Sequence, residues 1–257
     1  MTGESGGNNV RAVERALQIL GCFDEKHPER GVSEIAQAVG LHKATTHRIV
    51  TTLVSYGYLQ RADDGQRYRL GMALASLGFL VLRRTDVRRE AMPIMTELAS
   101  RLDETCDLSV YNRGEVYFVE VVQGSRALTV AAAVGRSLPI HATASGKVIL
   151  AFVPEAELEA ALDEPLVAHT HRTIMRPAEL RRQLEVVRAQ GFAVDDEELD
   201  LGVRAVSAPV RDRDGNVIGA LSVTCPTSRL PLDRIPSIAA EVRQAADAIS
   251  ARLGWHT

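Results

Sequence analysis

Apolar residues near the start of the chain recur at helical spacing in three successive segments. Between residues 10 and 23 they fall at positions 10, 13, 16, 17, 20 and 23, the period of a helix with one buried face. Residues 32–41 predict a second, short helix with Ser33 as its capping residue and Gly40 as the turn that ends it. A third helix is expected over residues 41 to about 55. Two short helices joined by a glycine turn are typical of a helix-turn-helix.

A β-hairpin is predicted directly after the third helix. Residues 58–61 and 67–70 favour strands, and the Asp-Gly pair at 64–65 between them is a strong hairpin signal. Three helices followed by a hairpin predict a winged helix-turn-helix domain over residues 9–71.

The rest of the chain predicts a linker and a second domain. Residues 72–90 predict a linker helix, whose longest apolar run has eleven residues, about half of the roughly 20 that a membrane span needs. We therefore expect no membrane partner. Residues 91–257 mix hairpin and amphipathic-helix patterns, with one strand expected at 127–135, which argues for an α+β fold. The Gly- and Asn-rich residues 1–8 predict a disordered tail.

The third predicted helix has two different faces. Ile49 and Leu53 form its apolar edge, and Thr45 and Thr46 lie near that edge, where hydroxyls reach phosphates or bond back to the helix. The opposite face is small, basic or hydroxylated and consists of Lys43, Ala44, His47, Arg48 and Thr51. A major groove admits one helix, and such side chains read base edges. This face therefore predicts a DNA reader; the alternative is the solvated face of an ordinary amphipathic helix.

Charge is distributed unevenly along the chain. The net charge is −3, but residues 9–71 carry nine Lys and Arg against seven Asp and Glu, and residues 41–62 contain no acidic residue. This local excess indicates a polyanionic partner for one patch. Arginines of the hairpin are expected at phosphates or in the minor groove, although one of them could only stabilise the hairpin. The residues expected to contact DNA are Ser33, Lys43, Ala44, Thr45, Thr46, His47, Arg48, Thr51, Arg61, Arg67 and Arg69.

Cysteine usage and the first residues predict a cytoplasmic protein. The three cysteines form no C-x-x-C pair, so neither a disulfide framework nor a zinc ribbon is implied. A reducing compartment is the simpler interpretation. No apolar run follows a basic start at the N-terminus, which argues against a signal peptide.

Longer stretches resemble a known family. "ALQILGCFDE", "GVSEIAQAVGLHKATTHRIVTTLVSYGYLQR" and "RYRLG" closely resemble the DNA-binding domain of the isocitrate lyase regulator (IclR) family of bacterial transcription factors. "LPIHATASGKVILA", "DDEELDLGVRAVSAPVRD" and "GALSVTCPTSRL" resemble landmarks of that family's effector domain. The resemblance covers residues 9 to 255 in the right order. It implies a winged-helix domain, a linker helix and a GAF-like α/β effector-binding domain, in proteins that form dimers or pairs of dimers and bind small metabolites, often organic or aromatic acids.

The resemblance also implies an effector pocket. Its residues would be Ala144 and Ser145, whose backbone amides face the ligand, then Asp195, Val203 and Ala205, and finally Ser222 and Thr224, a hydroxyl pair expected to hold a carboxylate. Some relatives that bind small keto acids have a cysteine at the position of Ala205, so the ligand stays open. Relatives also often carry Pro and Ser in place of His42 and Ala44; losing the hydroxyl at 44 would remove a phosphate contact, and His42 could supply another.

Taken alone, the pocket residues are less decisive. The alternation in "ALSVT" puts Ser222 and Thr224 on one strand face, which is either a pocket wall or a solvated face. Lys147 is expected on the surface. In the acidic run 195–198, only Asp195 is expected to contact a ligand, and the other carboxylates are expected to be solvated.

Catalytic chemistry has weaker support. "ASGK" echoes a phosphate-binding loop, but His141 and Val148 break the required pattern. The pair of histidines at 169 and 171 is a weak metal signal, and we expect exposed polar residues there. Cys225 lacks the elbow motif of a nucleophile and is expected to be a buried thiol. We expect no enzyme activity, cofactor or metal.

The sequence as a whole predicts a regulator that binds DNA in a sequence-specific way and responds to a small-molecule effector. A homodimer or a dimer of dimers would read a double-stranded operator with two half-sites. The main alternative is a constitutive architectural DNA binder whose C-terminal domain only dimerises. Repression or activation, and dimer or tetramer, are left open.

Overall fold

The structure is a computed structural model that describes residues 10–24, 26–63, 65–84, 86–112, 115–127, 129–130, 134–135 and 137–256. The chain divides into two compact units, Met1–Arg84 and Thr85–Thr257. The division falls within the segment 72–90 that was expected to link two domains. The expected N-terminal tail and the Asp64 position of the first hairpin turn lie outside the described residues, as does the turn at 113–114.

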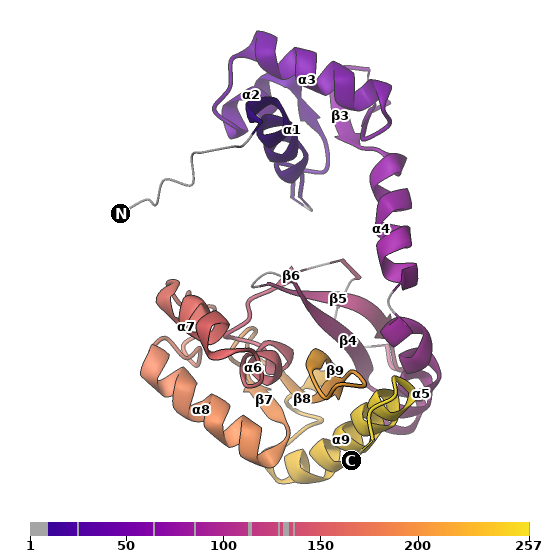
Figure 1. Ribbon diagram of the computed structural model, residues 1–257, viewed down its shortest axis with the longest axis vertical. Coiled ribbons are helices and arrows are strands. Elements are labelled where there is room, and N and C mark those ends of the chain that lie inside the picture. Colours follow the sequence, from indigo (N-terminus) through magenta and orange to yellow (C-terminus); the bar gives the residue numbers. More distant parts are fainter. Residues whose placement is uncertain are drawn as a thin grey trace. The chain divides into compact units, whose positions relative to one another are not determined.

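The N-terminal unit packs three helices against a small antiparallel sheet (Figure 1). Strand order in the sheet is β1-β3-β2. Buried side chains from all three helices and from the hairpin meet in one core, which includes Ile19, Ile35, Val50, Leu59 and Tyr68. The elements are α1 (Arg11–Gly21), β1 (Arg30–Gly31), α2 (Val32–Ala38), α3 (Lys43–Ser55), β2 (Leu59–Arg61), β3 (Arg67–Leu70) and α4 (Met72–Arg84). This is a winged helix-turn-helix.

The start of α2 differs from the sequence prediction. The helix begins at Val32, so Ser33 lies inside its first turn and does not cap it. The capping contact comes from Glu34, whose carboxylate accepts the backbone N–H of Gly31 at 2.7 Å. A carboxylate is favoured here because the first amides of a helix lack partners within the helix. At the other end, Gly40 has a φ of 63°, a conformation that favours glycine, and it turns the chain into α3.

The C-terminal unit is built on one six-stranded antiparallel sheet with strand order β6-β5-β4-β9-β8-β7. Helices α5 and α9 pack together along one side, and α6 packs against β8 and β9 from the other, with α8 outside it (Figure 1). The elements are α5 (Asp86–Leu102), β4 (Thr105–Asn112), β5 (Glu115–Val122), β6 (Ser137–Leu138), α6 (Ala144–Leu150), α7 (Glu155–Asp163), α8 (Pro177–Gln190), β7 (Ala193–Asp196), β8 (Val203–Arg211), β9 (Val217–Pro226), a 3-10 turn at Leu232–Arg234 and α9 (Ile235–Arg252).

The α+β class is confirmed, with one element misplaced. A strand was expected over residues 127–135, but the described residues there, 127, 129–130 and 134–135, lie in no strand. The strand of this region is β6, which pairs through Leu138 with Val116 of β5. None of the described helices is long and apolar enough to cross a membrane.

One face of the sheet carries several polar side chains. Residues directly opposite each other in neighbouring strands share a face, as do residues two apart in one strand. One row across the sheet consists of Asp107, Ser222 and Ser207, and the next row consists of Thr105, Thr224, Ala205 and Asp195. Four strands far apart in the sequence therefore present polar side chains to the same side, which is the side covered by α6.

Candidate nucleic-acid interface and ligand cavity

The outer face of α3 is accessible, as its amphipathic pattern predicts. The exposed residues are Lys43, Ala44, His47, Arg48 and Thr51. Thr45 is half-buried, and Val50 and Leu53 are buried in the core of the unit. Among the residues that the structure describes, no hydrogen bond or ion pair engages the side chains of Lys43, His47 and Arg48. Their donors are therefore available to a ligand outside the unit.

Thr46 is a correction to the expected DNA-contacting set. Its side chain is fully buried, and its hydroxyl donates to the carbonyl oxygen of His42 at 3.2 Å. A buried hydroxyl must find a partner, and the carbonyl four residues earlier is the nearest acceptor in a helix. Thr51 donates in the same way to His47 at 2.8 Å. Thr46 thus belongs to the core, although Thr51 stays exposed on the outer face.

The three wing arginines have partners within the unit. Arg61 donates to the carbonyl oxygen of Gly65 at 2.8 Å and lies over the ring of Tyr68, so it stabilises the hairpin. Arg67 forms an ion pair with Glu34 at 3.1 Å. Arg69 has looser contacts, at 3.7 Å each, to Glu29 and Asp63. These pairs are exposed and therefore weak, so Arg67 and Arg69 can exchange them for phosphates. Ser33 is exposed at the start of α2.

Two further arginines lie beside this face and were missed by the sequence prediction. Arg11 and Arg15 of α1 line a shallow surface hollow together with His47 and Arg48 of α3. Spacing of four residues places the two arginines on one side of α1. That spacing was visible in the sequence, but which helix packs beside α3 depends on tertiary contacts.

The second candidate site is a cavity in the C-terminal unit. It is lined by all seven residues that the resemblance implied, Ala144, Ser145, Asp195, Val203, Ala205, Ser222 and Thr224. Phe118, Leu138 and Leu199 add apolar wall. The cavity has a volume of about 60 Å³, several times the roughly 10–15 Å³ that one water molecule requires. The structure thus brings together residues from α6, β7, β8 and β9.

The start of α6 is held at the cavity by local geometry. The Thr143 hydroxyl accepts the backbone N–H of Gly146 at 3.1 Å and donates to the carbonyl oxygen of Pro139 at 3.1 Å. A Cβ at Gly146 would lie 2.0 Å from the carbonyl oxygen of Ile140, so only glycine allows this close approach. The turn that precedes α6 therefore packs directly on the helix.

Asp107 of β4 also lines the cavity and was not predicted. Its side chain is buried, and the Thr224 hydroxyl donates to its Oδ2 atom at 3.0 Å. Burial raises the pKa of Asp107 to about 6, although hydrogen bonds from Thr224 and Ser222 oppose this shift. The sequence signal was the alternation of Thr105, Asp107 and Ser109 with apolar residues. Only the pairing of β4 with β9 places Asp107 opposite Ser222.

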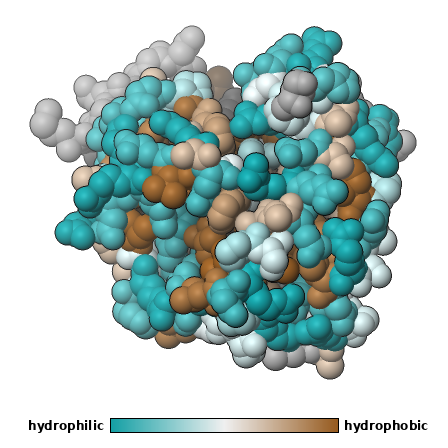
Figure 2. All heavy atoms as spheres, turned by 90° about the horizontal axis from the view of Figure 1, so that it is seen from below, coloured by the Kyte–Doolittle hydropathy of each residue, from teal (hydrophilic) through white to brown (hydrophobic). Residues whose placement is uncertain are grey.

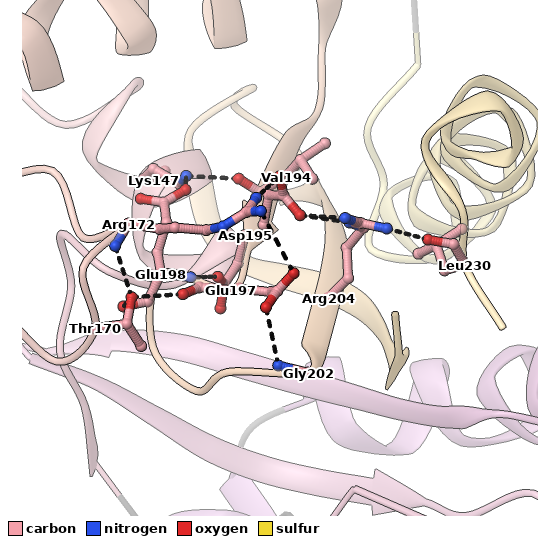
Figure 3. A network of polar contacts seen from close by, with 11 residues as sticks. Lys147, Thr170, Arg172, Val194, Asp195, Glu197, Glu198, Gly202, Arg204 and Leu230 are labelled. Carbon is pink, nitrogen blue, oxygen red and sulfur yellow. Dashed lines mark hydrogen bonds and ion pairs between the residues drawn. The ribbon is translucent and has the colours of Figure 1, made fainter. Parts of the chain in front are cut away.

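A buried charge network lies behind Asp195 (Figure 3) and corrects two expectations. Lys147 was expected on the surface, yet its side chain is fully buried and its ammonium contacts the Glu198 carboxylate and, at 2.5 Å, the carbonyl oxygen of Val194. Glu198 was expected to be solvated and is buried as well. An uncompensated charge is costly away from water, so each needs the other.

Asp195 links this network to the cavity. Its Oδ1 atom accepts the backbone N–H of Glu198 at 2.7 Å. Burial raises the pKa of Asp195 to about 7. The hydrogen bond from the Glu198 backbone N–H and the charge of Lys147 oppose this shift, while the charge of the Glu198 carboxylate adds to it. Asp196, next in the chain, points away and pairs with Arg172 at 2.8 Å and with Arg204.

The catalytic alternatives gain no support from the geometry. Cys225 is buried, and burial raises its pKa to about 11, so its thiol is protonated at neutral pH. The Nε2 atom of His141 lies 2.9 Å from the carbonyl oxygen of Val167. Burial lowers the pKa of His141. Within the described ranges no group of three or more His, Cys, Asp or Glu is arranged to hold a metal ion.

Comparison with known proteins gives one consistent result. Residues 12–63 match the IclR helix-turn-helix domain, and residues 79–251 match the C-terminal domain of the bacterial transcriptional regulator IclR. The HTH-type transcriptional regulator XynR of Escherichia coli is 37% identical over 247 residues, which cover 96% of this chain and 98% of that protein. KdgR of Dickeya chrysanthemi, also named an HTH-type transcriptional regulator, is 33% identical and covers 97% of this chain and 82% of its own length.

Solved structures agree with this result. The IclR protein of Thermotoga maritima superposes with a TM-score of 0.73 at 30% identity and covers 96% of this chain and 100% of its own. An IclR homologue from Microbacterium hydrocarbonoxydans, solved in complex with 4-hydroxybenzoate, has a TM-score of 0.81 at 30% identity over 94% of this chain and 98% of its own. With the winged helix, the exposed basic face of α3 and the cavity, these matches show that the chain belongs to the IclR family of DNA-binding bacterial transcriptional regulators.

Proposed function

We propose that this regulator senses a small organic or aromatic acid in the C-terminal cavity and changes its affinity for an operator in response. The observation that carries the proposal is the convergence of seven expected pocket residues on one cavity. The complex of the Microbacterium hydrocarbonoxydans homologue with 4-hydroxybenzoate supports the aromatic acids as a ligand class. Ligand binding changes operator affinity only if the ligand prefers one arrangement of the protein.

We assign the roles of the segments accordingly. Residues 9–71 form the DNA-binding domain, residues 72–90 the linker helix and residues 91–257 the effector-binding and oligomerisation domain. The side chains of α3 that contact DNA bases are Lys43, Ala44, His47, Arg48 and Thr51. Thr45, Arg67 and Arg69 contact phosphates. Arg11 and Arg15, beside α3, extend the phosphate-binding surface. We place the protein in the cytoplasm, where operator DNA and metabolites are both present.

An apolar stripe supports assembly as a homodimer. Val10 immediately precedes α1, Val13 and Leu17 lie on that helix, and the three side chains are 66%, 56% and 62% exposed. Their spacing places them on one face of the helix. On the face of the protein shown in Figure 2, apolar side chains lie in separate groups between hydrophilic ones. A continuous exposed stripe is more typical of an interface between proteins than scattered apolar residues are.

The test of the reading face is operator binding by an His47→Ala, Arg48→Ala double variant, with the operator selected from random DNA by repeated binding. Because base contacts are lost, we expect the affinity to fall by about 1–3 kcal/mol per base contact. Arg182→Ala, which removes an exposed arginine of α8, is the matched control and should bind normally. Unchanged affinity of the double variant would refute the assignment of α3.

The effector half has a separate test. Operator affinity is measured with and without small acids in solution. A change in affinity supports the proposal. If no acid changes either operator affinity or melting temperature, the protein behaves as the architectural DNA binder that is the main alternative.

A further inference from the structure

Asp107 occupies a position in the cavity that no predicted motif contains. It lies on β4, opposite Ser222 of the central strand β9, and its side chain is 2% exposed. Its carboxyl group lines the same cavity as Ser222 and Thr224. The cavity therefore has an acidic side chain directly beside the hydroxyl pair that was expected to hold the carboxylate of a ligand.

That hydroxyl pair is already engaged. Thr224 donates its hydroxyl hydrogen to Asp107 at 3.0 Å. The Ser222 hydroxyl contacts the Ser207 hydroxyl, and Ser222 also acts to lower the pKa of Asp107. Each hydroxyl has a single hydrogen to donate. The hydroxyl hydrogen of Thr224 is thus given to the protein's own carboxylate, and a ligand carboxylate would find this donor occupied.

Asp107 keeps acceptor capacity toward the cavity. An ionised carboxylate offers about four acceptor positions, and the Thr224 hydroxyl uses one of them. A ligand carboxylate placed against Asp107 would face a like charge, whereas a ligand hydroxyl would supply the missing donor. None of the described residues that line the cavity is Lys, Arg or His, so no cation there offsets Asp107.

We propose that Asp107 determines effector specificity by accepting a hydrogen bond from a hydroxyl group of the ligand, so that the cavity selects a small hydroxylated acid over the same acid without the hydroxyl. This inference rests on the proposed function, because it refines the acid class that the cavity is taken to sense.

The other charged groups around the cavity are consistent with this role of Asp107. Asp107 faces hydroxyls from β9, and Asp195 of β7 borders the cavity with the Lys147–Glu198 pair behind it. Asp200, the remaining acidic residue of the lining, is exposed. Because burial raises the pKa of Asp107 to about 6, this side chain is ionised and purely an acceptor in the neutral range.

The test is a thermal-shift and calorimetric screen of paired acids on the full chain. The pairs are 4-hydroxybenzoate and benzoate, lactate and propionate, and gluconate and hexanoate. We expect at least one hydroxylated acid to bind tenfold or more tightly than its partner, because a site built to bond a hydroxyl rejects the analogue that lacks it. In Asp107→Asn this preference should fall to within about threefold. Asp163→Asn, at an exposed carboxyl of the same unit outside the cavity lining, should keep the full preference.

The outcomes separate the two proposals. Acids that bind with no hydroxyl preference, or with a preference that Asp107→Asn leaves intact, overturn the role of Asp107 while acid sensing stands. If no acid of the panel binds, the acid-sensing function fails and this inference fails with it. Operator affinity, measured in the same samples, reports on α3 independently of either result.

Discussion

Lys147 lies on α6 with its ammonium group fully buried, in contact with the Glu198 carboxylate. In the described part of the chain, the Oε2 atom of Glu198 has no hydrogen-bond partner. The pair is thus enclosed, and its stability depends on both members being present. The stability of the C-terminal unit is therefore sensitive to mutation of either residue, because removing one partner leaves a buried charge without compensation.

Lys147→Met should therefore destabilise the C-terminal unit by about 3–5 kcal/mol. Urea unfolding followed by circular dichroism measures the loss. The double variant Lys147→Met, Glu198→Gln should recover part of it, because the buried carboxylate is then neutral as well. Arg172→Ala, which breaks an exposed pair with Asp196, is the matched control and should cost at most about 1 kcal/mol. A loss as small as that of the control would contradict the buried ion pair.

Among the secondary-structure elements, β4 differs most from what its sequence pattern predicts. Its alternation of Thr105, Asp107 and Ser109 with apolar residues is that of an ordinary half-buried strand. Pairing with β9 turns this polar face toward α6, where water is largely excluded. A residue that would be solvated on an edge strand thereby becomes a buried acid.

This placement predicts a specific pH dependence of stability. The folded protein holds a proton on Asp107 up to about pH 6, while the ordinary pKa of an aspartate is 3.8. The folded state therefore binds more protons between these values, and the free energy of unfolding falls as pH rises through this window. For one group the slope is at most about 1.4 kcal/mol per pH unit.

Asp107→Asn should remove this contribution. Urea unfolding of the ligand-free protein between pH 4 and 7 should show the variant gaining stability relative to the wild type as pH rises from about 4 to 6. Asp195, with a pKa raised to about 7, contributes in both proteins, so the difference between them isolates Asp107. Asp200→Asn should run parallel to the wild type. Parallel curves for Asp107→Asn would mean that this carboxyl is ionised throughout the window.

For the whole molecule, we propose that two copies of the chain act together on DNA. In this arrangement each α3 covers one half-site of the operator, and the linked contacts of the two copies raise the affinity. The exposed stripe of Val10, Val13 and Leu17 is the surface that we assign to pairing of the N-terminal units.

Val13→Lys, Leu17→Lys should weaken operator binding tenfold or more, because like charges on the stripe oppose pairing of two reading helices. A DNA fragment with a single half-site should bind the variant as tightly as it binds the wild type. Gel-shift titration with the full operator and with the half-site fragment measures both affinities. Val186→Lys, at a residue of α8 that is 55% exposed, is the control for adding a lysine to an apolar surface. Equal losses on full and half operators would place the stripe outside the dimer interface.

Local sequence patterns were sufficient to predict most of the structure of the N-terminal unit. The helical period, the Gly40 turn and the Asp-Gly hairpin signal are properties of adjacent residues, and they predicted the winged helix and the outer face of α3. The same patterns failed where a side chain had a choice of partner. Ser33 was expected as a cap, but the longer Glu34 side chain reaches the Gly31 amide, and Thr46 turned inward to bond its own helix.

In the C-terminal unit, sequence patterns and family landmarks were enough to predict the family, the α+β class and seven residues that line the cavity. That Asp107 joins them, and that Lys147 and Glu198 are buried together, follows from the fold alone. These contacts depend on strand order and on helix docking, which bring together residues dozens of positions apart. A period of two or 3.6 residues reports which side of an element is apolar, but not which strand or helix it will meet.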